Sequence, residues 1–228
     1  MRDFMFSILK VIFWFSLIFV FYTYFGYPIL LIIAAKLRSK PMDKGEIFPA
    51  VTMIIAAYNE ENTIRDKLEN ALDIDYPKDR FEIIVVSDGS SDRTDDIVNE
   101  FSGRGVRLIR IPERGGKARA LNAVVPEANG EIIVFSDARQ LYDKNAVREL
   151  ISNFNDASVG AVSGELYLIN QDGGGVSEGV GAYWKYEKLM RRMESRIYST
   201  SGATGAIYAI RKELYRPIND DTILDDVV

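Results

Sequence analysis

Acidic and basic side chains gather in four short clusters, each directly after an apolar run. The clusters are Tyr58-Asn59-Glu60, Asp88-Gly89-Ser90-Ser91, Arg114-Gly115-Gly116-Lys117 and Asp137-Ala138-Arg139. Carboxylates accept hydrogen bonds from hydroxyl and ring N–H groups, whereas lysine and arginine bind phosphate oxygens. A site that combined all four clusters would therefore suit a ligand with a base, a sugar and a diphosphate.

The apolar runs that must position these clusters have the character of β-strands. They are Val51–Ala57, Phe81–Ser87, Val106–Ile111 and Glu131–Phe135, all short and rich in β-branched residues. Helix-like stretches lie between them, which is typical of an α/β fold with a largely parallel sheet. Ligands bind outside the carboxyl ends of the strands in such a sheet. All four clusters are expected at that edge.

The remaining elements follow from capping residues and periodicity. We expect Asn59 to cap a helix that runs to about Leu72, and Ser90 or Ser91 to cap the next. Further helices are predicted at Lys144–Phe154 and Gly181–Ile197, and strands within Ser158–Leu168 and Ala203–Ile210.

Two common nucleotide-binding folds lack their sequence signature. A dinucleotide fold needs G-x-G-x-x-G after the first strand, where this chain has Ala57-Tyr58-Asn59-Glu60-Glu61. A P-loop needs Ser or Thr after its lysine, but Ala118 follows Gly116-Lys117. The first-strand turn also argues against a nucleotidyltransferase, which would need a basic, glycine-rich loop there.

Each candidate side chain also has a purely structural interpretation. Asp88 and Asp137 can be helix-capping or turn aspartates, a role worth about 1 kcal/mol. Lys117 and Arg119 can form a solvated basic turn, or they can hold a diphosphate beside two glycines at a helix start. Asp225-Asp226 can be a solvated cap, or supply a general base. The chain has no histidine, so a base must be a carboxylate, Lys or Tyr.

The first 35 residues predict a membrane segment. Residues 4–35 are almost wholly apolar, with Lys10 as their one charge, and about 20 such residues span a bilayer. A cleaved signal peptide would have a shorter apolar region. Gly26 and Pro28 predict a kink or tilt. Four basic residues follow the segment: Lys36, Arg38, Lys40 and Lys44. The positive-inside rule therefore places residues 36–228 in the cytoplasm.

The composition of the chain argues against some classes of binding partner and metal site. The 28 Lys and Arg against 33 Asp and Glu give a net charge of −5, which argues against nucleic acid. There is no cysteine, which excludes disulfides and thiolate metal sites.

The motifs together resemble the inverting family-2 glycosyltransferases, particularly membrane-embedded synthases of cellulose, hyaluronan and poly-N-acetylglucosamine. The matching stretches, in order, are VTMIIAAYNEENTI (51–64), EIIVVSDGSSDRTDDI (82–97), GGKARALNAVV (115–125), IIVFSDARQLY (132–142), SGATGAIYAIRKELY (201–215) and ILDDV (223–227). The resemblance implies a GT-A fold, Rossmann-like with helices on both faces of a mostly parallel sheet, after one transmembrane helix.

It also implies roles for individual residues. Ala57, Tyr58, Glu60 and Asp88 would hold the base and ribose of a nucleotide-sugar donor, usually a UDP-sugar. Lys117 and Arg119 would face the diphosphate. Asp137 would be the first acid of the D-x-D motif and a ligand of Mg²⁺ or Mn²⁺, with Arg139 beside it. Thr204-Gly205 would lie near the acceptor sugar. Asp226 would be the catalytic base, the second acid of a pair with Asp225.

Two departures from the family pattern matter. Arg139 replaces the second acid of D-x-D, so either the metal is held differently or a guanidinium neutralises the charge. The Q-x-x-R-W motif and the later membrane helices do not occur in these residues. We therefore expect a transmembrane anchor at 1–36, a linker at 37–50 and a catalytic domain at 51–228 that is incomplete at its C-terminus.

The predicted function is transfer of a sugar from a nucleotide-sugar donor to a saccharide or lipid-linked acceptor. The expected setting is the cell (inner) membrane, crossed once, with the catalytic domain in the cytoplasm. A partner chain that supplies the missing C-terminal part would fit this layout. The alternative is a truncated, inactive chain that binds nucleotide or serves as a scaffold.

Overall fold

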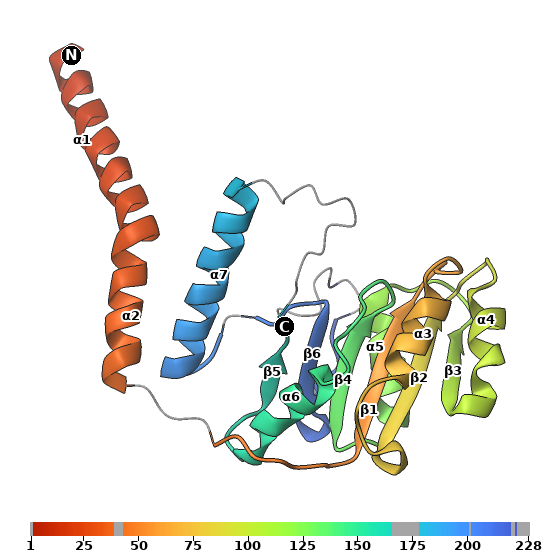
Figure 1. Cartoon of the computed structure of the whole chain (residues 1–228). Coiled ribbons are helices and arrows are strands. Elements are labelled where there is room, and N and C mark those ends of the chain that lie inside the picture. The colour runs from red at the N-terminus through yellow and green to blue at the C-terminus, as the bar shows by residue number, and fades with distance from the viewer. Residues whose placement is uncertain (1, 39–42, 166–177, 201, 220–221, 223–228) are drawn as a thin grey trace. The chain divides into compact units, whose positions relative to one another are not determined.

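In the computed structural model, a six-stranded sheet carries helices on both faces (Figure 1). The structure describes residues 2–38, 43–165, 178–200, 202–219 and 222. The chain divides into two units, one of residues 1–41 with 168–200 and one of residues 42–167 with 201–228. The sheet belongs to the second unit.

The sheet has the strand order β3-β2-β1-β4-β6-β5. The first four strands are mutually parallel, and β6 runs antiparallel to both β4 and β5. The strands are β1 (Val51–Ala57), β2 (Phe81–Asp88), β3 (Val106–Ile111), β4 (Ile132–Asp137), β5 (Ala161–Ser163) and β6 (Ile207–Arg211). The prediction of an α/β fold with a mostly parallel sheet is confirmed.

Helices cover both faces of this sheet, which explains why its central strands read as continuous apolar runs. They are α3 (Ile64–Leu72), α4 (Thr94–Glu100), α5 (Lys117–Val124) and α6 (Ala146–Ser152). Met53 and Ile55 of β1 share one core with α3, α4 and α6, while Ile54 shares the other with α5. Short 3₁₀ turns lie at Lys78–Arg80, Ser102–Arg104, Val125–Glu127, Asn153–Asn155 and Lys212–Leu214.

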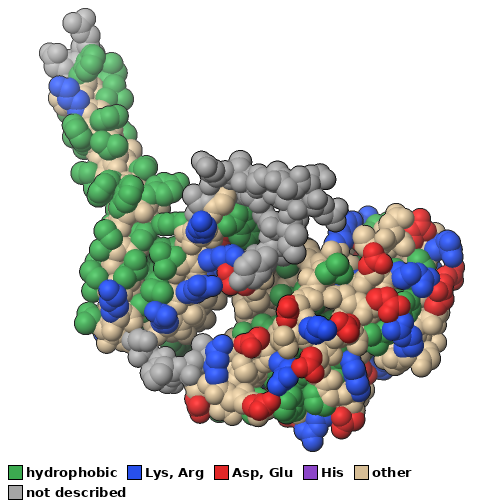
Figure 2. Space-filling view, in the orientation of Figure 1, with side chains coloured by type: hydrophobic (Ala, Val, Ile, Leu, Met, Phe, Trp, Pro, Cys, Tyr) green, Lys and Arg blue, Asp and Glu red, His purple; other side chains and the backbone are tan. Residues whose placement is uncertain are grey.

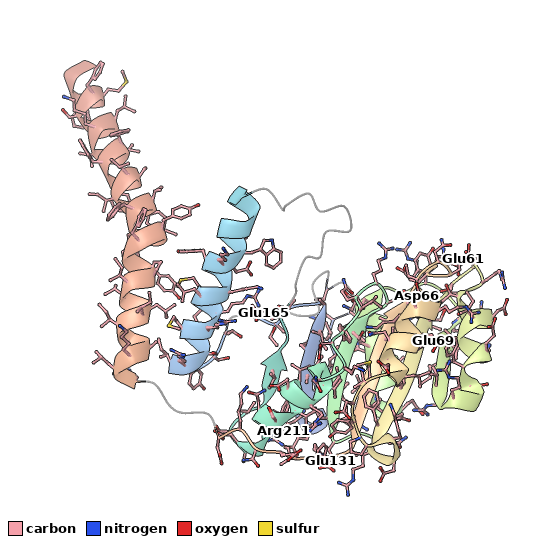
Figure 3. The ribbon with its side chains drawn as sticks, in the orientation of Figure 1. Glu61, Asp66, Glu69, Glu131, Glu165 and Arg211 are labelled. Carbon is pink, nitrogen blue, oxygen red and sulfur yellow. The ribbon has the colours of Figure 1, made fainter. Side chains whose placement is uncertain are left out.

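The parallel strands end in register. Ala56 of β1 lies opposite Asp137 of β4, and Ala57 lies opposite Ser87 of β2. The strand order reverses between β1 and β4, which is where open α/β sheets bind ligands. Figure 3 shows Glu61, just beyond β1, and Glu131, just before β4, at opposite edges of the sheet.

The predicted caps of α3 and α4 are wrong. Asn59 has a left-handed backbone (φ 52°), and its side-chain oxygen accepts the Ser91 N–H at 2.8 Å. Ser90 likewise turns away from α4, because its hydroxyl accepts the Asn59 N–H at 3.2 Å. At the start of α4 an Asp92 oxygen accepts the Thr94 N–H instead. The expected cap residues therefore tie the turns after β1 and β2 to each other.

The first unit contains α1 (Arg2–Phe21), the π-helical turn Tyr22–Gly26, α2 (Tyr27–Arg38) and α7 (Glu178–Ile197). Helix α7 packs against α2. Residues Phe4–Arg38 form one helical stretch that is long and apolar enough to cross a membrane. The Tyr27 N–H donates to the Tyr22 carbonyl, five residues back, just before Pro28. Proline disrupts regular helical bonding in the turn before it, where the sequence predicted a kink.

Candidate functional site

Asp88, the last residue of β2, holds the glycine loop that leads into α5. Its Oδ1 accepts the Gly115 N–H and its Oδ2 the Gly116 N–H, each at 2.8 Å. The loop comes so close to Gly89 that a Cβ there would lie 2.6 Å from the Arg114 nitrogen. Gly89 and Gly116 also have positive φ (68° and 89°), which favours glycine at both positions. The buried carboxylate thus fixes the backbone at the start of α5.

Lys117, which follows this loop, contacts the last residue of β4. As the first residue of α5, it places its Nζ 2.9 Å from Asp137 Oδ1, and both side chains are about one-third exposed. A Cβ on Gly115 would overlap the aliphatic part of the Arg119 side chain, so that side chain lies along the loop. Lys117, a cation expected at a diphosphate, thus stands beside the acid expected at the D-x-D position, and Arg119 lies along the same loop.

Glu60 and Arg139 form a second ion pair at the same edge. Arg139 Nε donates to Glu60 Oε1 at 2.8 Å, and the Thr63 hydroxyl donates to Glu60 Oε2 at 2.8 Å. The Glu60 side chain is 13% exposed and that of Arg139 is 71% exposed. The Arg114 guanidinium lies 4.0 Å from the ring centroid of Tyr58, within cation–π range.

Thr204 and Gly205 come to this edge because β6 is antiparallel. Ile207, at the start of β6, lies opposite Ser136 near the end of β4. The Thr204 N–H donates to the Ser163 hydroxyl at 2.8 Å, which ties the turn to β5.

The structure therefore brings most of the predicted site residues to one edge of the sheet. They are Ala57, Tyr58, Glu60, Asp88, Lys117, Arg119, Asp137, Arg139, Thr204 and Gly205. The roles assigned to them stay predictions. Asp225 and Asp226, the predicted catalytic pair, lie outside the described residues.

Helix α3 holds the other side of the site, through residues that the sequence analysis missed. Lys67 is fully buried, and its Nζ donates to the Gln140 carbonyl at 2.7 Å and lies 3.5 Å from the Tyr142 ring centroid. The Asn70 side chain bonds the backbone of Tyr142 twice, at 2.9 and 2.8 Å. These contacts fix the segment that follows Asp137. The available signal was a lysine in the buried stripe of α3, three residues after Ile64.

Burial shifts the pKa values of Lys67 and Tyr142 on this side of the site. It lowers the pKa of Lys67 to about 7, and the nearby Asp137 charge opposes that shift. Burial also raises the pKa of Tyr142, whose hydroxyl lies 2.7 Å from both the Ser136 hydroxyl and the Ala206 carbonyl. Tyr142 thus joins β4 to the turn before β6 as a neutral phenol.

The described residues do not form a metal centre. Among them, no three Asp, Glu, His or Cys side chains group closely enough to hold an ion. Asp137 is paired with Lys117, and the next D-x-D position is Arg139. Mg²⁺ often takes only one or two carboxylates together with substrate phosphates. Asp137 is the described residue that would have to supply such a ligand.

A separate hollow of about 460 Å³ lies away from this edge. Its lining includes Lys44, Glu46, Asn145 and Arg148. The Arg148 guanidinium already binds Asp75 at 2.7 Å and Glu46 at 2.8 Å. We place the site at the carboxyl edge, because the glycine loop and the acid–cation pairs converge there.

Comparison with known families agrees with this arrangement. Residues 52–218 match the model of glycosyl transferase family 2, which covers most of the chain. The chain belongs to glycosyltransferase family 2. Its fold is accordingly of the GT-A type, and the matched residues include nearly the whole sheet of the second unit as well as α7 of the first.

Curated relatives match parts of this domain. The probable glycosyltransferase YdaM of Bacillus subtilis (strain 168) is 45% identical over 128 residues, or 54% of this chain and 30% of the relative. The poly-beta-1,6-N-acetyl-D-glucosamine synthase of Staphylococcus aureus (strain MSSA476) is 33% identical over 138 residues, or 60% of this chain and 33% of the relative. The matched part thus spans about a third of the length of these relatives.

A solved structure covers more of the chain. The mannosyltransferase PcManGT from Pyrobaculum calidifontis, in complex with GDP-Man and Mn²⁺, is 30% identical with a TM-score of 0.75. The match covers 92% of this chain and 60% of that protein.

Lys67 makes stability depend on pH. The unfolded lysine keeps its proton up to about pH 10.4, whereas the native one loses it near pH 7, so native stability rises between these values. Lys67→Met removes this titration. We expect the native protein to gain about 2–3 kcal/mol relative to the variant between pH 6.5 and 9 in urea unfolding. Leu68→Met is the control, because it alters packing only. A pH-independent difference would contradict this prediction.

Asp88→Asn tests the bonds to the glycine loop. The amide nitrogen cannot accept one of the two backbone N–H groups, and an unsatisfied buried donor costs about 1–3 kcal/mol. We expect weaker UDP binding by that amount in calorimetry on the whole chain in detergent. Asp96→Asn on the exposed side of α4 makes the same charge change and should leave binding intact. Equal affinities for the three proteins would show that Asp88 supports no donor site.

Proposed function

We propose that this chain is a membrane-anchored inverting glycosyltransferase. It transfers a sugar from a nucleotide-sugar donor to a saccharide or lipid-linked acceptor. The observation that carries this proposal is the bidentate contact of Asp88 with the Gly115 and Gly116 amides. That contact fixes a glycine loop and Lys117 beside Asp137, at the edge where α/β sheets bind their ligands.

The donor proposal rests on the chemistry of this edge. The N-terminus of α5 offers backbone amides and a positive dipole, and Lys117 and Arg119 add two cations, which together suit a diphosphate. Tyr58, Glu60 and Asp88 would face the base and ribose. We propose a UDP-sugar as the donor. The neighbour PcManGT was solved with GDP-Man, so binding of GDP should be measured beside that of UDP.

The membrane proposal rests on the apolar helix Phe4–Arg38 and the basic residues Lys36 and Arg38 in the last turn of α2. The layout would be an anchor at 1–36, a linker at 37–50 and a catalytic domain from 51 onward. The positive-inside rule then puts that domain in the cytoplasm at the cell membrane.

The proposed reaction needs one base and no covalent intermediate. An acceptor hydroxyl gives its proton to Asp226 as its oxygen attacks the anomeric carbon in line. The bond from that carbon to the diphosphate breaks, and the nucleoside diphosphate leaves. Lys117 and Arg119 hold the developing negative charge.

Asp226→Asn tests this assignment. Asparagine keeps the shape but cannot accept the hydroxyl proton, and base catalysis contributes about 10²–10⁴-fold. We expect sugar transfer to fall by that factor while donor binding stays normal. The assay uses membranes containing this chain, with the rest of the synthase supplied where turnover requires it.

Asp225→Asn is the matched control and should reduce transfer less. Near-normal transfer by Asp226→Asn would remove Asp226 from the mechanism. Donor binding without any transfer by the native protein would favour the nucleotide-binding scaffold instead.

Metal dependence should be weaker than in an enzyme with two D-x-D acids. Arg139 supplies positive charge where a second carboxylate would bind an ion, and Asp137 is already paired. We expect UDP affinity to fall less than about tenfold when a chelator is titrated in. Arg139→Asp restores the second acid and should increase the response to Mg²⁺ or Mn²⁺. Complete loss of binding in chelator would mean that an ion is essential to the native site.

A further inference from the structure

The strand order limits where an acceptor can meet the donor. In the proposed site the base lies beside Asp88 at the end of β2, and the diphosphate lies beside Lys117 and Asp137 at the end of β4. The next strand along the sheet is β6, and the turn before it reaches the same edge (Figure 1). A donor that extends from β2 to β4 would therefore direct its sugar toward the turn Thr204–Ala206.

Surface charge does not mark out an acceptor site on this unit. Figure 2 shows acidic and basic side chains interspersed over the visible face of the second unit. The hydroxyl groups of a saccharide are neutral and need directed hydrogen bonds rather than an area of one charge. The position of the backbone at the carboxyl edge is therefore what must be controlled.

The Tyr142 side chain connects the turn to the end of β4. Its hydroxyl lies 2.7 Å from the Ala206 carbonyl and 2.7 Å from the Ser136 hydroxyl. A carbonyl can only accept, so the single phenol proton goes to Ala206, and Ser136 donates to the phenol oxygen. Ser136 precedes Asp137 and Ala206 follows Gly205. One side chain thus ties the expected donor edge to the expected acceptor turn.

Helix α3 holds Tyr142 itself in place. The Asn70 side chain bonds the Tyr142 N–H at 2.8 Å and the Tyr142 carbonyl at 2.9 Å. The Lys67 Nζ lies 3.5 Å from the centroid of the Tyr142 ring. The phenol cannot move with the turn unless these contacts to α3 break. The position of the turn therefore depends on the phenol rather than the reverse.

A second contact holds the other end of the turn. The Ser163 hydroxyl in β5 accepts the Thr204 N–H at 2.8 Å. The Ile207 N–H closes the turn on the Thr204 carbonyl at 3.1 Å. The turn is thus held at Thr204 by β5 and at Ala206 by Tyr142.

We propose that Tyr142 is a positioning residue for the acceptor. Its hydroxyl fixes Thr204–Ala206 relative to Asp137, and so sets the distance between the acceptor hydroxyl and the anomeric carbon of the donor. Tyr142 acts through the Ala206 backbone and touches neither substrate. A misplacement of about 1 Å can reduce a rate about 10²-fold. This inference rests on the proposed function and on the acceptor role predicted for Thr204 and Gly205.

Tyr142→Phe tests the contact, because it removes one oxygen and keeps the ring beside Lys67. Ser136 can still donate to the Asp137 carbonyl at 3.1 Å, so the main loss falls on the Ala206 carbonyl. We expect kcat/KM for the acceptor to fall about 10- to 100-fold. The affinity for the nucleoside diphosphate should stay at the native value.

Tyr76→Phe is the matched control. The Tyr76 hydroxyl is also that of a buried tyrosine, and it donates to the Pro49 carbonyl at 2.8 Å, before β1 at the opposite edge of the sheet. The control loses the same kind of bond far from the site, so kcat/KM for the acceptor should stay at the native value. An equal fall in both variants would overturn the inference.

The assay offers UDP-glucose, UDP-N-acetylglucosamine and GDP-mannose with the disaccharides cellobiose, diacetylchitobiose and mannobiose. The pair that the native chain turns over in membranes, with the rest of the synthase supplied where turnover requires it, is used for each variant. Donor hydrolysis is followed in parallel. In that reaction a water oxygen bonds the anomeric carbon, its proton passes to the base and the nucleoside diphosphate leaves. A misplaced acceptor turn should raise the ratio of hydrolysis to transfer, whereas a loss of folded protein lowers both alike.

Ser163→Ala loosens the same turn from its other end and lies away from the donor loop. It should also raise the ratio of hydrolysis to transfer, which keeps the inference testable if Tyr142→Phe folds poorly.

Amide hydrogen exchange tests the tie without any substrate, on the full chain in detergent. Peptides that cover Thr204–Ile207 should exchange faster in Tyr142→Phe than in the native protein or in Tyr76→Phe. Peptides that cover Gly115–Lys117 should exchange at the native rate. Native exchange of Thr204–Ile207 in Tyr142→Phe would show that the phenol does not hold the turn, and would overturn the inference.

The two proposals fail in different ways. Normal transfer by the native protein, with an unchanged ratio of hydrolysis to transfer in Tyr142→Phe, would overturn this inference alone. Nucleotide binding without transfer by the native protein would favour the scaffold alternative, and this inference would fall together with the proposed function.

Discussion

Both oxygens of Asp88 accept backbone hydrogen bonds, and the geometry of the carboxyl edge depends on this contact. A glycine pair has more backbone freedom than any other dipeptide, so Gly115-Gly116 would sample many conformations without an anchor. Charge-assisted bonds to Asp88 select one of them. The first turn of α5, and with it Lys117, is thereby fixed relative to β2 and β4.

The opposite wall of the site depends on a buried cation. Lys67 and Asn70 reach from α3 to the segment after Asp137, which has no regular secondary structure of its own up to Tyr142. A buried ammonium is costly unless it is well paired. Here a carbonyl and an aromatic ring accept it. Burial lowers the Lys67 pKa to about 7, which makes this wall sensitive to pH while the Asp88 wall rests on backbone bonds.

Sequence patterns predicted the sheet well, because strand signals are local. The bounds of Val51–Ala57 and Val106–Ile111 agree with the structure, and the clusters after the strands do meet at one edge. Caps were harder to predict. Asn59 and Ser90 have the side chains of helix caps, yet their partners come from another turn more than 30 residues away. Local propensity carries no information about such a partner.

Lys67 also shows that a distant partner cannot be predicted from local sequence. Its place in the buried stripe of α3 is visible in the sequence, but its acceptor lies 73 residues away on the Gln140 backbone. Every residue has a backbone carbonyl, so the sequence cannot show which one will bind a buried lysine. The pattern therefore indicates that a lysine lies in the buried stripe but does not identify its partner. The Asp88 contact was missed for the same reason, since its partners are the backbone amides of a loop 27 residues further along the chain.

The acids at this edge are already engaged, which constrains how a diphosphate can enter. Arg139 is mostly exposed, so turning it from Glu60 toward a phosphate costs little desolvation, and Thr63 still bonds the acid that it leaves. Moving Lys117 is different, because it would leave Asp137 without that ammonium partner at the moment negative charge arrives. An unpaired Asp137 would then attract a divalent ion. If a diphosphate binds here as proposed, the need for metal would depend on which cation meets the phosphates: Arg139 would permit binding without an ion, and withdrawal of Lys117 would call for one.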